Sequence, residues 1–386
     1  MSRSDRGREL LPQLEAARRD QGDVVRLPHT PVCFADPEAA KAVLGNPDGL
    51  FREHSDFFHI RHGIFGPRQA QVDIARAGRV FLRERMAEVF AAVPEAVARS
   101  LVGVGSSVGA GIGVAETEWP DAGNRLVYDL TADLLVGRHR DPAQRALLNE
   151  IFERGVLAGA RGRYSRRERA RFRKRAFDGL AEAVRQSRRA GSGHPPGDLL
   201  DVVALSAGDQ PDRDVAEVFI SHVFALTGSV GFALGWSVLL TGGVAPESAR
   251  HGWVVREALR MWPVAWLFGR TVAQDHELAG TRLRRDDDVI VCSYLVHRHP
   301  EHWPEPDAFR PERWADLTGP PAYLPFGWGP HSCTGAAIAL ELVERLLEEI
   351  FRYEVRVSAR ADRPDMGPAL APPLFRVRAT ARTSTC

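Results

Sequence analysis

The apolar positions of this chain repeat at helical spacing over long stretches and alternate with polar positions in a few short ones. From about Ala70 to Leu101 they recur every three to four residues among arginines, and the same spacing returns from about Thr334 to Arg352. Two long amphipathic helices are therefore expected. Val24 to Phe34, interrupted by a Pro-His-Thr-Pro turn, and Val289 to Val296 are typical of short strands. Asp36 before Pro37 predicts the start of a helix.

The segment from Val218 to Leu240 contains no Asp, Glu, Lys or Arg. Its length would be enough to cross a membrane. However, glycines and serines lie near its middle, no second segment of this kind occurs, and the rest of the sequence is rich in charge. We therefore expect a helix buried at the centre of a large domain and no membrane association.

The order of these elements predicts a mainly helical α+β protein with small sheets. No internal repeat and no clear interdomain linker is found, so one large domain over residues 1–386 is expected. Its β-rich parts would span about residues 24–35 and 265–300, and its helical core about 70–260 and 320–355.

Composition narrows the class of protein. The 386 residues are 44% hydrophobic and 26% charged, and 51 Lys and Arg against 50 Asp and Glu give a net charge of +1. These values disfavour a disordered chain and a basic nucleic-acid-binding protein. The four cysteines, Cys33, Cys292, Cys333 and Cys386, are far apart, which favours a reducing compartment over a disulfide scaffold. The charged N-terminus has no apolar signal sequence, so a cytoplasmic location is expected.

Two further segments carry weaker signals. The glycine-rich stretch from Gly103 to Gly113 lacks the spacing of a dinucleotide-binding or P-loop motif, so a loop is expected there. The stretch from Arg161 to Arg175 predicts an arginine-dense helix. Such a helix is most often simply solvated, but it could also receive an anionic substrate or an acidic carrier protein.

The strongest chemical signal surrounds Cys333, within the sequence Phe-Gly-Trp-Gly-Pro-His-Ser-Cys-Thr-Gly at 326–335. The cysteine follows a turn rich in Gly and Pro and precedes a helix, whose positive N-terminal end favours a thiolate. The glycines would allow the backbone to approach a large flat ligand. This cysteine could alternatively be a zinc ligand or a nucleophile. The other three cysteines, Cys33, Cys292 and Cys386, are expected to be inert. His297, His299 and His302 lie nearby in sequence and are expected at the surface.

This ten-residue stretch resembles the FxxGxxxCxG haem-binding loop of the cytochrome P-450 family. Glu257 and Arg260 resemble the family's ExxR helix, and Arg313, in Pro-Glu-Arg-Trp, resembles its meander arginine. The resemblance implies the cytochrome P-450 fold, with these three charged residues in a network that holds the haem-loop side. It also implies haem b, bound through the thiolate of Cys333 as its iron ligand.

The same resemblance implies roles for further residues. Phe326 would cover the sulfur, and Gly327, Gly329 and Gly335 would shape the loop. Arg270 and His331 would hold the haem propionates. Arg79 and Arg83 stand where bacterial members carry a His and an Arg for the propionates, and arginine is a sound replacement because it can bond a carboxylate bidentately.

The central segment departs from the family pattern. Where the family usually carries an acid followed by an alcohol to deliver protons during oxygen activation, this chain has Val230 and Gly231. Thr227 or Ser229 is expected to hold a water instead, or a polar group of the substrate replaces the alcohol. The stretch between Gly231 and Glu257 is also shorter than in the family by about two or three helical turns, so the helix there is expected to be truncated along residues 241–248.

The function implied is a monooxygenase-type haem-thiolate oxidoreductase that oxidises a small organic molecule, either free or tethered to a carrier protein, in bacterial secondary metabolism. A ferredoxin and its reductase would supply electrons. An apolar distal wall is expected from six residues of the central helix: Phe224, Leu226, Gly228, Val230, Gly231 and Phe232. Two alternatives stay open: a peroxide-using, rearranging or coupling haem-thiolate enzyme, and a non-catalytic relative that acts as a partner protein.

Overall fold

The computed structural model describes all residues except 1–2, 54, 103–114, 158–162, 192, 194, 248–249, 318, 320–321, 360–363, 368 and 383–386. In chain order, the first half contains α1 (Arg3–Gln21), β1 (Val24–Val25), β2 (Val32–Phe34), α2 (Pro37–Gly45), β3 (His59–Ile60), β4 (Gly63–Ile64), α3 (Arg68–Val102), β5 (Ala115–Trp119), α4 (Asp121–Leu135), α5 (Pro142–Ile151), the π-helix η1 (Phe152–Val156) and α6 (Arg166–Ala190).

The second half continues with α7 (Leu199–Ser206), α8 (Asp212–Val223), the π-helix η3 (Phe224–Ser229), α9 (Val230–Leu240), α10 (His251–Met261), β6 (Leu267–Thr271), β7 (His276–Leu278), β8 (Thr281–Leu283), β9 (Asp288–Cys292) and α11 (Ser293–Val296). The 3₁₀ helices η5 (Pro311–Ala315) and η6 (Gly329–His331), α12 (Ala336–Ile350), β10 (Tyr353–Ala359), β11 (Asp365–Met366), β12 (Leu370–Ala371) and β13 (Phe375–Ala381) complete the described chain.

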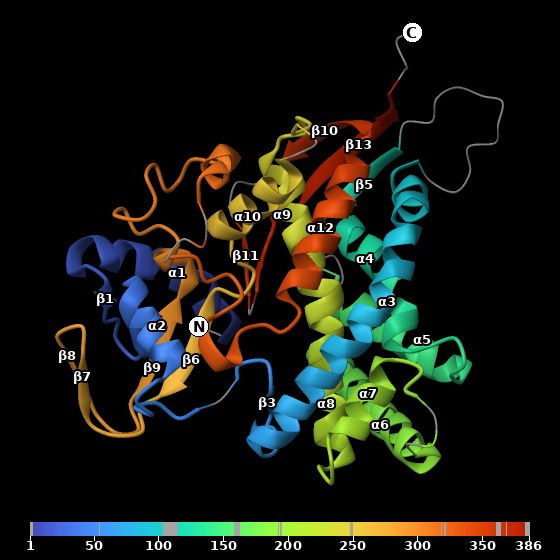
Figure 1. Ribbon diagram of the computed structural model, residues 1–386, viewed down its shortest axis with the longest axis horizontal. Coiled ribbons are helices and arrows are strands. Elements are labelled where there is room, and N and C mark those ends of the chain that lie inside the picture. Colours follow the sequence, from blue (N-terminus) through green and yellow to red (C-terminus); the bar gives the residue numbers. More distant parts are fainter. Residues whose placement is uncertain are drawn as a thin grey trace.

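Two parts far apart in sequence share the largest sheet. Its order is β1-β2-β9-β6, so the N-terminal strand pair joins strands that follow α10. β2 runs parallel to β9, with Val32 opposite Val289, and the other pairings are antiparallel. Figure 1 shows this sheet, together with α1 and α2, on one side of the molecule, beside the larger group formed by the other helices. The strand expected over Val289–Val296 is only half correct, because the chain turns into α11 at Ser293.

The helices form the larger body. α3, α4, α9 and α12 pack against one another, and α8 and α9 cross the middle of the body (Figure 1). Both long amphipathic helices expected from the sequence are present, as α3 and α12. Asp36 caps α2, accepting a hydrogen bond from the amide of Ala39 at 2.6 Å, as the Asp-Pro pair predicts.

The apolar central segment is a core helix. α8, η3 and α9 follow one another without a break from Asp212 to Leu240. Within the described residues this is the one helix long and apolar enough to cross a membrane. Of its most apolar stretch of 18 residues, 72% is buried inside the protein. Burial among other helices accounts for its lack of charge.

Several local expectations are corrected or lie beyond the described residues. The arginine-dense helix begins at Arg166, not Arg161, because Ser165 caps it in a reciprocal capping box with Glu168. Residues 241–247 form turns and irregular chain without a helix, as expected for a truncated segment. The glycine-rich stretch at 103–113 and Cys386 lie outside the described residues.

Candidate functional site

The loop before α12 is held in a conformation that requires glycine. Gly327 and Gly329 have φ angles of 73° and 72°, in the left-handed region that side chains disfavour. A Cβ on Gly329 would also lie 2.7 Å from the Cα of Gly45 in α2, so the loop backbone packs directly on that helix. The amide of Cys333 donates to the carbonyl of Phe326 at 2.9 Å, which closes the loop and places the cysteine at its end.

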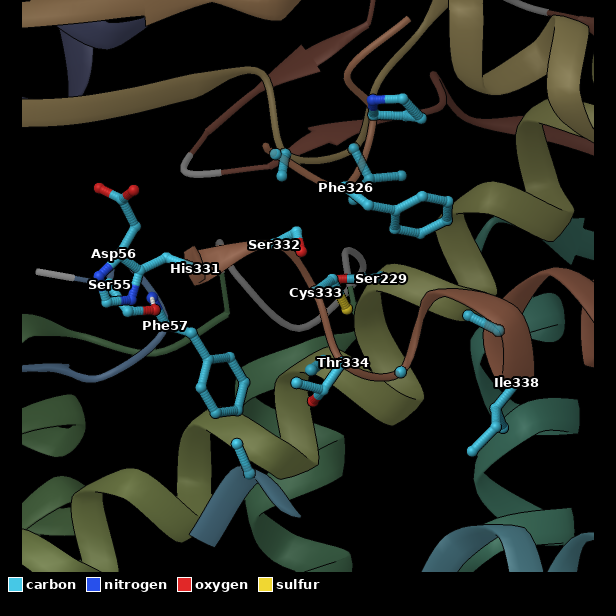
Figure 2. A pocket seen from close by; sticks show the side chains of 18 of the residues that line it. Ser55, Asp56, Phe57, Ser229, Phe326, His331, Ser332, Cys333, Thr334 and Ile338 are labelled. Atoms are coloured by element: carbon cyan, nitrogen blue, oxygen red, sulfur yellow. Dashed lines mark hydrogen bonds between the residues drawn. The ribbon is translucent and has the colours of Figure 1, made fainter. Parts of the chain in front are cut away.

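Cys333 lines a cavity of about 470 Å³. The loop forms one wall and the central helix the other, and Figure 2 shows Cys333 of the loop and Ser229 of the helix among the lining residues. The remaining lining is mostly apolar and includes Phe326 of the loop and Ile338 of α12. A flat ligand that bonds the sulfur would lie between the loop and the helix.

The expected thiolate character of Cys333 is not found in the protein alone. The amides of Gly335 and Ala336 donate to the sulfur and lower its pKa, as the position before a helix predicts. Burial has the larger effect, however, and the pKa of the thiol lies above its ordinary value. A metal ion at the sulfur would reverse this balance, because it stabilises the deprotonated ligand directly.

A buried ionic network lies behind the loop. Glu257 of α10 and Arg260 one turn later are both fully buried and joined by two hydrogen bonds of 2.9 and 3.0 Å. Arg313 of η5 donates to the same carboxylate at 3.1 Å, and so do the indole of Trp314 at 2.9 Å and the amide of Arg310 at 3.0 Å. Five donors thus compensate one buried carboxylate, and α10 is tied to the meander.

His297 extends this network to the cysteine loop. Its Nδ1 lies 3.1 Å from the carbonyl of Arg260, and its Nε2 accepts from the amide of Leu324 at 2.7 Å. Burial lowers its pKa to about 3, so the ring is neutral. The expectation of surface histidines is wrong for His297 and also for His299, which is buried against Asp23 at 3.1 Å. His302 is partly buried beside His299.

The zinc alternative finds no support among the described residues. The metal-compatible cluster of His, Cys and carboxylate groups found there consists of His139, Asp198 and Asp201, and Cys333 is not part of it. Arg140 already donates to both carboxylates of that cluster at 2.5 to 2.9 Å.

The basic residues expected at the propionates are only partly brought together. Arg270, His331 and Arg79 line the cavity. Arg270 is buried and donates through Nη1 to Asp56 at 3.0 Å and to the carbonyl of Gly269, and its other nitrogens have no partner among the described residues. His331 lies 3.6 Å from Glu53. Arg83 is exposed and outside the cavity lining, because Leu82 occupies the inward position of that turn of α3, so the expectation for Arg83 is wrong.

One face of the central helix lines the cavity, and it differs from the expected one. The lining residues recur every three to four positions: His222, Ala225, Leu226, Ser229, Val230 and Ala233. Of the six residues expected at the distal wall, only Leu226 and Val230 belong to this set. The other four, Phe224, Gly228, Gly231 and Phe232, are not on the lining.

Of the two alcohols of the central helix that were expected to act in catalysis, only one lines the cavity. Ser229 lines the cavity, but Thr227 is fully buried on another face and donates its hydroxyl to the carbonyl of Val223 at 2.7 Å. A proton-delivering role for Thr227 is therefore contradicted by its position. Gly228 faces Val156 of η1 instead, and Gly231 faces Asn124 of α4.

Among the lining residues that the sequence analysis did not name are His222, Phe57 and Phe58. His222 belongs to the apolar central segment, where a single histidine gives no signal of its own. Phe57 and Phe58 belong to a segment without a strong hydrophobic repeat. Only the packing of α8 against the chain before β3 brings these residues together.

Comparison with known proteins agrees with this geometry. Residues 252–373 match the family model "Cytochrome P450". The chain is 45% identical over 172 residues to cyclooctatin synthase of Streptomyces melanosporofaciens, covering 36% of this chain and 38% of that protein. It is 40% identical over 103 residues to cytochrome P450 3A19 of Capra hircus aegagrus, covering 26% of this chain and 47% of that protein. The chain thus spans less than half the length of these curated relatives.

Solved structures match over nearly the whole chain. A mutant of P450 EryK in complex with erythromycin B covers 99% of both chains with a TM-score of 0.71 and 20% identity. CYP109E1 from Bacillus megaterium in complex with corticosterone covers 97% of this chain and 99% of its own, with a TM-score of 0.74 and 18% identity. The fold is that of the cytochromes P450, and residues 252–373 match the sequence model of that family.

The cofactor of this family is haem with a cysteine thiolate ligand, and the residues present fit it. A cysteine sulfur opens into the cavity, and Gly327 and Gly335 of the same loop lie on its lining. Cations lie on the cavity lining where acidic side groups of the cofactor would need them. Cys333 would hold the iron, Arg270, His331 and Arg79 the propionates, and Phe326 and Gly335 lie beside the sulfur on the loop side.

Proposed function

We propose that this protein is a haem-thiolate oxidoreductase of the monooxygenase type that oxidises an apolar small molecule. The observation that carries the proposal is the position of Cys333, whose sulfur opens into a cavity faced by the apolar side of the central helix. When bound through a cysteine thiolate, haem supplies one-electron and oxygen chemistry, because the thiolate donates electron density to the iron.

The walls of the cavity indicate the class of substrate. Leu226, Val230 and Ala233 of the central helix and Phe57 and Phe58 opposite them offer mainly hydrocarbon surface, which binds an apolar ligand. Cyclooctatin synthase of Streptomyces and the P450 EryK structure with erythromycin B support a role in bacterial secondary metabolism. Such a role implies a cytoplasmic enzyme that receives electrons from a ferredoxin and its reductase.

A substrate tethered to a carrier protein is a finer form of this proposal. P450BioI, solved in complex with an acyl carrier protein, matches this chain with a TM-score of 0.71 and 15% identity. The N-terminal half of α6 offers a matching surface, since Arg166, Arg167, Arg169 and Arg173 are exposed and have no ion-pair partner among the described residues. Replacing Arg166, Arg167 and Arg169 by Gln should weaken binding of an acidic carrier and flatten its salt dependence, and unchanged affinity would contradict this form.

The chain's own proton route would differ from the family pattern. Ser229 carries the hydroxyl of the central helix that lines the cavity, as Cys333 does on the loop side (Figure 2). Its Oγ would hold a water and pass a proton toward the reacting centre. Gly231, which stands at the position of the family alcohol, lies against Asn124 and leaves no room for a side chain.

A second candidate function follows from the same helix. Its cavity face carries no carboxylate among the described residues, and its polar members are Ser229 and His222. An enzyme that consumes peroxide, or that rearranges or couples its substrate, would not need the usual acid and alcohol. Turnover with hydrogen peroxide should then exceed turnover with a ferredoxin, its reductase and dioxygen, whereas activity only with the reductase system would eliminate this candidate.

The first experiment is the carbon monoxide difference spectrum of the dithionite-reduced holoprotein, measured beside Cys333→Ala. A strongly red-shifted Soret band in the wild type and its loss in the variant are expected for a thiolate ligand. Cys292→Ala is a matched control, because Cys292 is buried in the sheet and away from the cavity. A protein that purifies without haem, or a band typical of histidine ligation, would overturn the proposal and favour a non-catalytic partner protein.

A further inference from the structure

His222 is an ionisable residue that lines the cavity. It has no part in holding the haem or in the proposed proton route. It lies near the end of α8, on the face of the central helix that continues through Leu226 and Ser229. The edge of its ring meets the ring of Phe57, with centroids 4.7 Å apart and planes at 87°. The ring is thus held in one orientation by an aromatic contact from the opposite wall.

The hydrogen bonds of the ring define its tautomer. Nδ1 lies 3.0 Å from the carbonyl oxygen of Val218, which can only accept, so Nδ1 must carry a proton. Burial lowers the pKa of His222 to about 4, so the ring is neutral near pH 7. A neutral imidazole with a proton on Nδ1 has a lone pair on Nε2, which makes Nε2 an acceptor.

This acceptor has no donor within the described part of the chain. The neighbouring position on α3 is Gly78, where an added Cβ would lie 4.0 Å from Nε2 and 3.7 Å from Leu199. The glycine therefore leaves the side of Nε2 that faces α3 uncovered. His222 is half-buried, and it lines the cavity rather than the outer surface. An acceptor on a cavity wall needs a donor from a ligand or a water.

We propose that Nε2 of His222 accepts a hydrogen bond from a hydroxyl or N–H group of the substrate and so positions it in the cavity. This inference rests on the proposed function and narrows its substrate to apolar molecules with a neutral hydrogen-bond donor at one end. Ser229, seven residues further along the same face of the helix, also lines the cavity.

The test compares 1-decanol with its methyl ether, which keeps the oxygen but cannot donate. Their dissociation constants are measured by calorimetry with the haem-loaded wild type, His222→Phe and His222→Gln. Phenylalanine keeps the ring and its contact with Phe57, and glutamine can return an oxygen near the position of Nε2. We expect the wild type to bind the alcohol roughly fivefold more tightly than the ether, as one net hydrogen bond provides.

In His222→Phe the preference for the alcohol should fall to about one, and His222→Gln should restore part of it. A purely structural role for His222 would weaken both ligands equally and leave their ratio unchanged, which would overturn the assignment. Equal affinities in the wild type, or no binding of either ligand to the haem-loaded protein, would overturn it as well. Failure of the proposed function is separate, since it appears as a missing red-shifted Soret band before any ligand is added.

Discussion

Asn124 of α4 and Gly231 of α9 are in direct contact at the centre of the molecule. A Cβ built on Gly231 would lie 2.3 Å from Nδ2 of Asn124 and 2.7 Å from its Cα. The same Nδ2 donates to the carbonyls of Thr227 and Gly228 at 2.8 and 3.0 Å, within the π-helix η3. The absence of an alcohol at 231 thus has a physical reason, because α4 occupies the space that a side chain would need.

The first prediction concerns this close approach. Gly231→Ala should reduce the free energy of unfolding by about 1–3 kcal/mol, since its methyl group would displace backbone as well as the Asn124 side chain. Gly78→Ala is the matched control, because its Cβ meets nothing closer than 3.7 Å and removes the flexibility of a helical glycine. Denaturant unfolding of both variants measures the difference, and equal stabilities would contradict the contact.

The second prediction concerns the hydrogen bonds of Asn124. Asn124→Ala leaves two buried carbonyls of the π-helix without a side-chain donor and should cost about 2 kcal/mol of stability. Asn149, on the exposed side of α5, gives the control Asn149→Ala, which should change stability by less than about 0.5 kcal/mol. Thermal unfolding followed by circular dichroism distinguishes the two, and an unchanged melting temperature in Asn124→Ala would show that η3 does not depend on this side chain.

The features that could be predicted from the sequence are those that depend on residues close together along the chain. The loop around Cys333 carries its glycines, its cysteine and the start of α12 within ten positions, and all of these lie where expected. The face of the central helix was placed wrongly, because it depends on Asn124, about a hundred residues away, and on a π-helical turn that a hydrophobic repeat does not reveal. Thr227 and Ser229 are both small alcohols, and only packing distinguishes the buried one from the one that reaches the cavity.

The protonation state of Cys333 and the burial of His297 could not be predicted for a related reason. The dipole of a following helix can be inferred from sequence, but the desolvation that outweighs it depends on the surrounding walls. His297 follows a short helix in a region rich in proline, and only the fold brings it between Arg260 and Leu324.

The third prediction concerns the buried network behind the loop. Glu257→Gln removes the charge that compensates Arg260 and Arg313, and the loss should be about 3–5 kcal/mol with poor haem retention. Glu341→Gln breaks an exposed pair with Arg345 one turn apart, and should cost less than about 0.5 kcal/mol. Urea unfolding and the ratio of Soret to protein absorbance measure both effects. Similar behaviour of the two variants would refute a structural role for the network.

The fourth prediction is a pH dependence of stability that arises from His222 and His297. Burial lowers their pKa values to about 4 and about 3, below the value of 6.5 that each has when exposed. Between these values the unfolded chain binds more protons than the folded one, so stability is complete above about pH 6.5 and falls as the pH drops toward 4. For His222 alone the loss at pH 4 is about 3 kcal/mol, because each pKa unit corresponds to about 1.4 kcal/mol.

This contribution can be isolated by comparing His222→Gln with His62→Gln. His62 is exposed, so its variant should keep the slope of the wild type between pH 4 and 6.5. His222→Gln should have a shallower slope, because glutamine binds no proton, and its stability relative to the wild type should rise as the pH falls. Urea unfolding at half-unit pH steps measures this slope. If His222→Gln and the wild type lost stability in parallel, folding would not lower the pKa of His222, which would contradict this prediction.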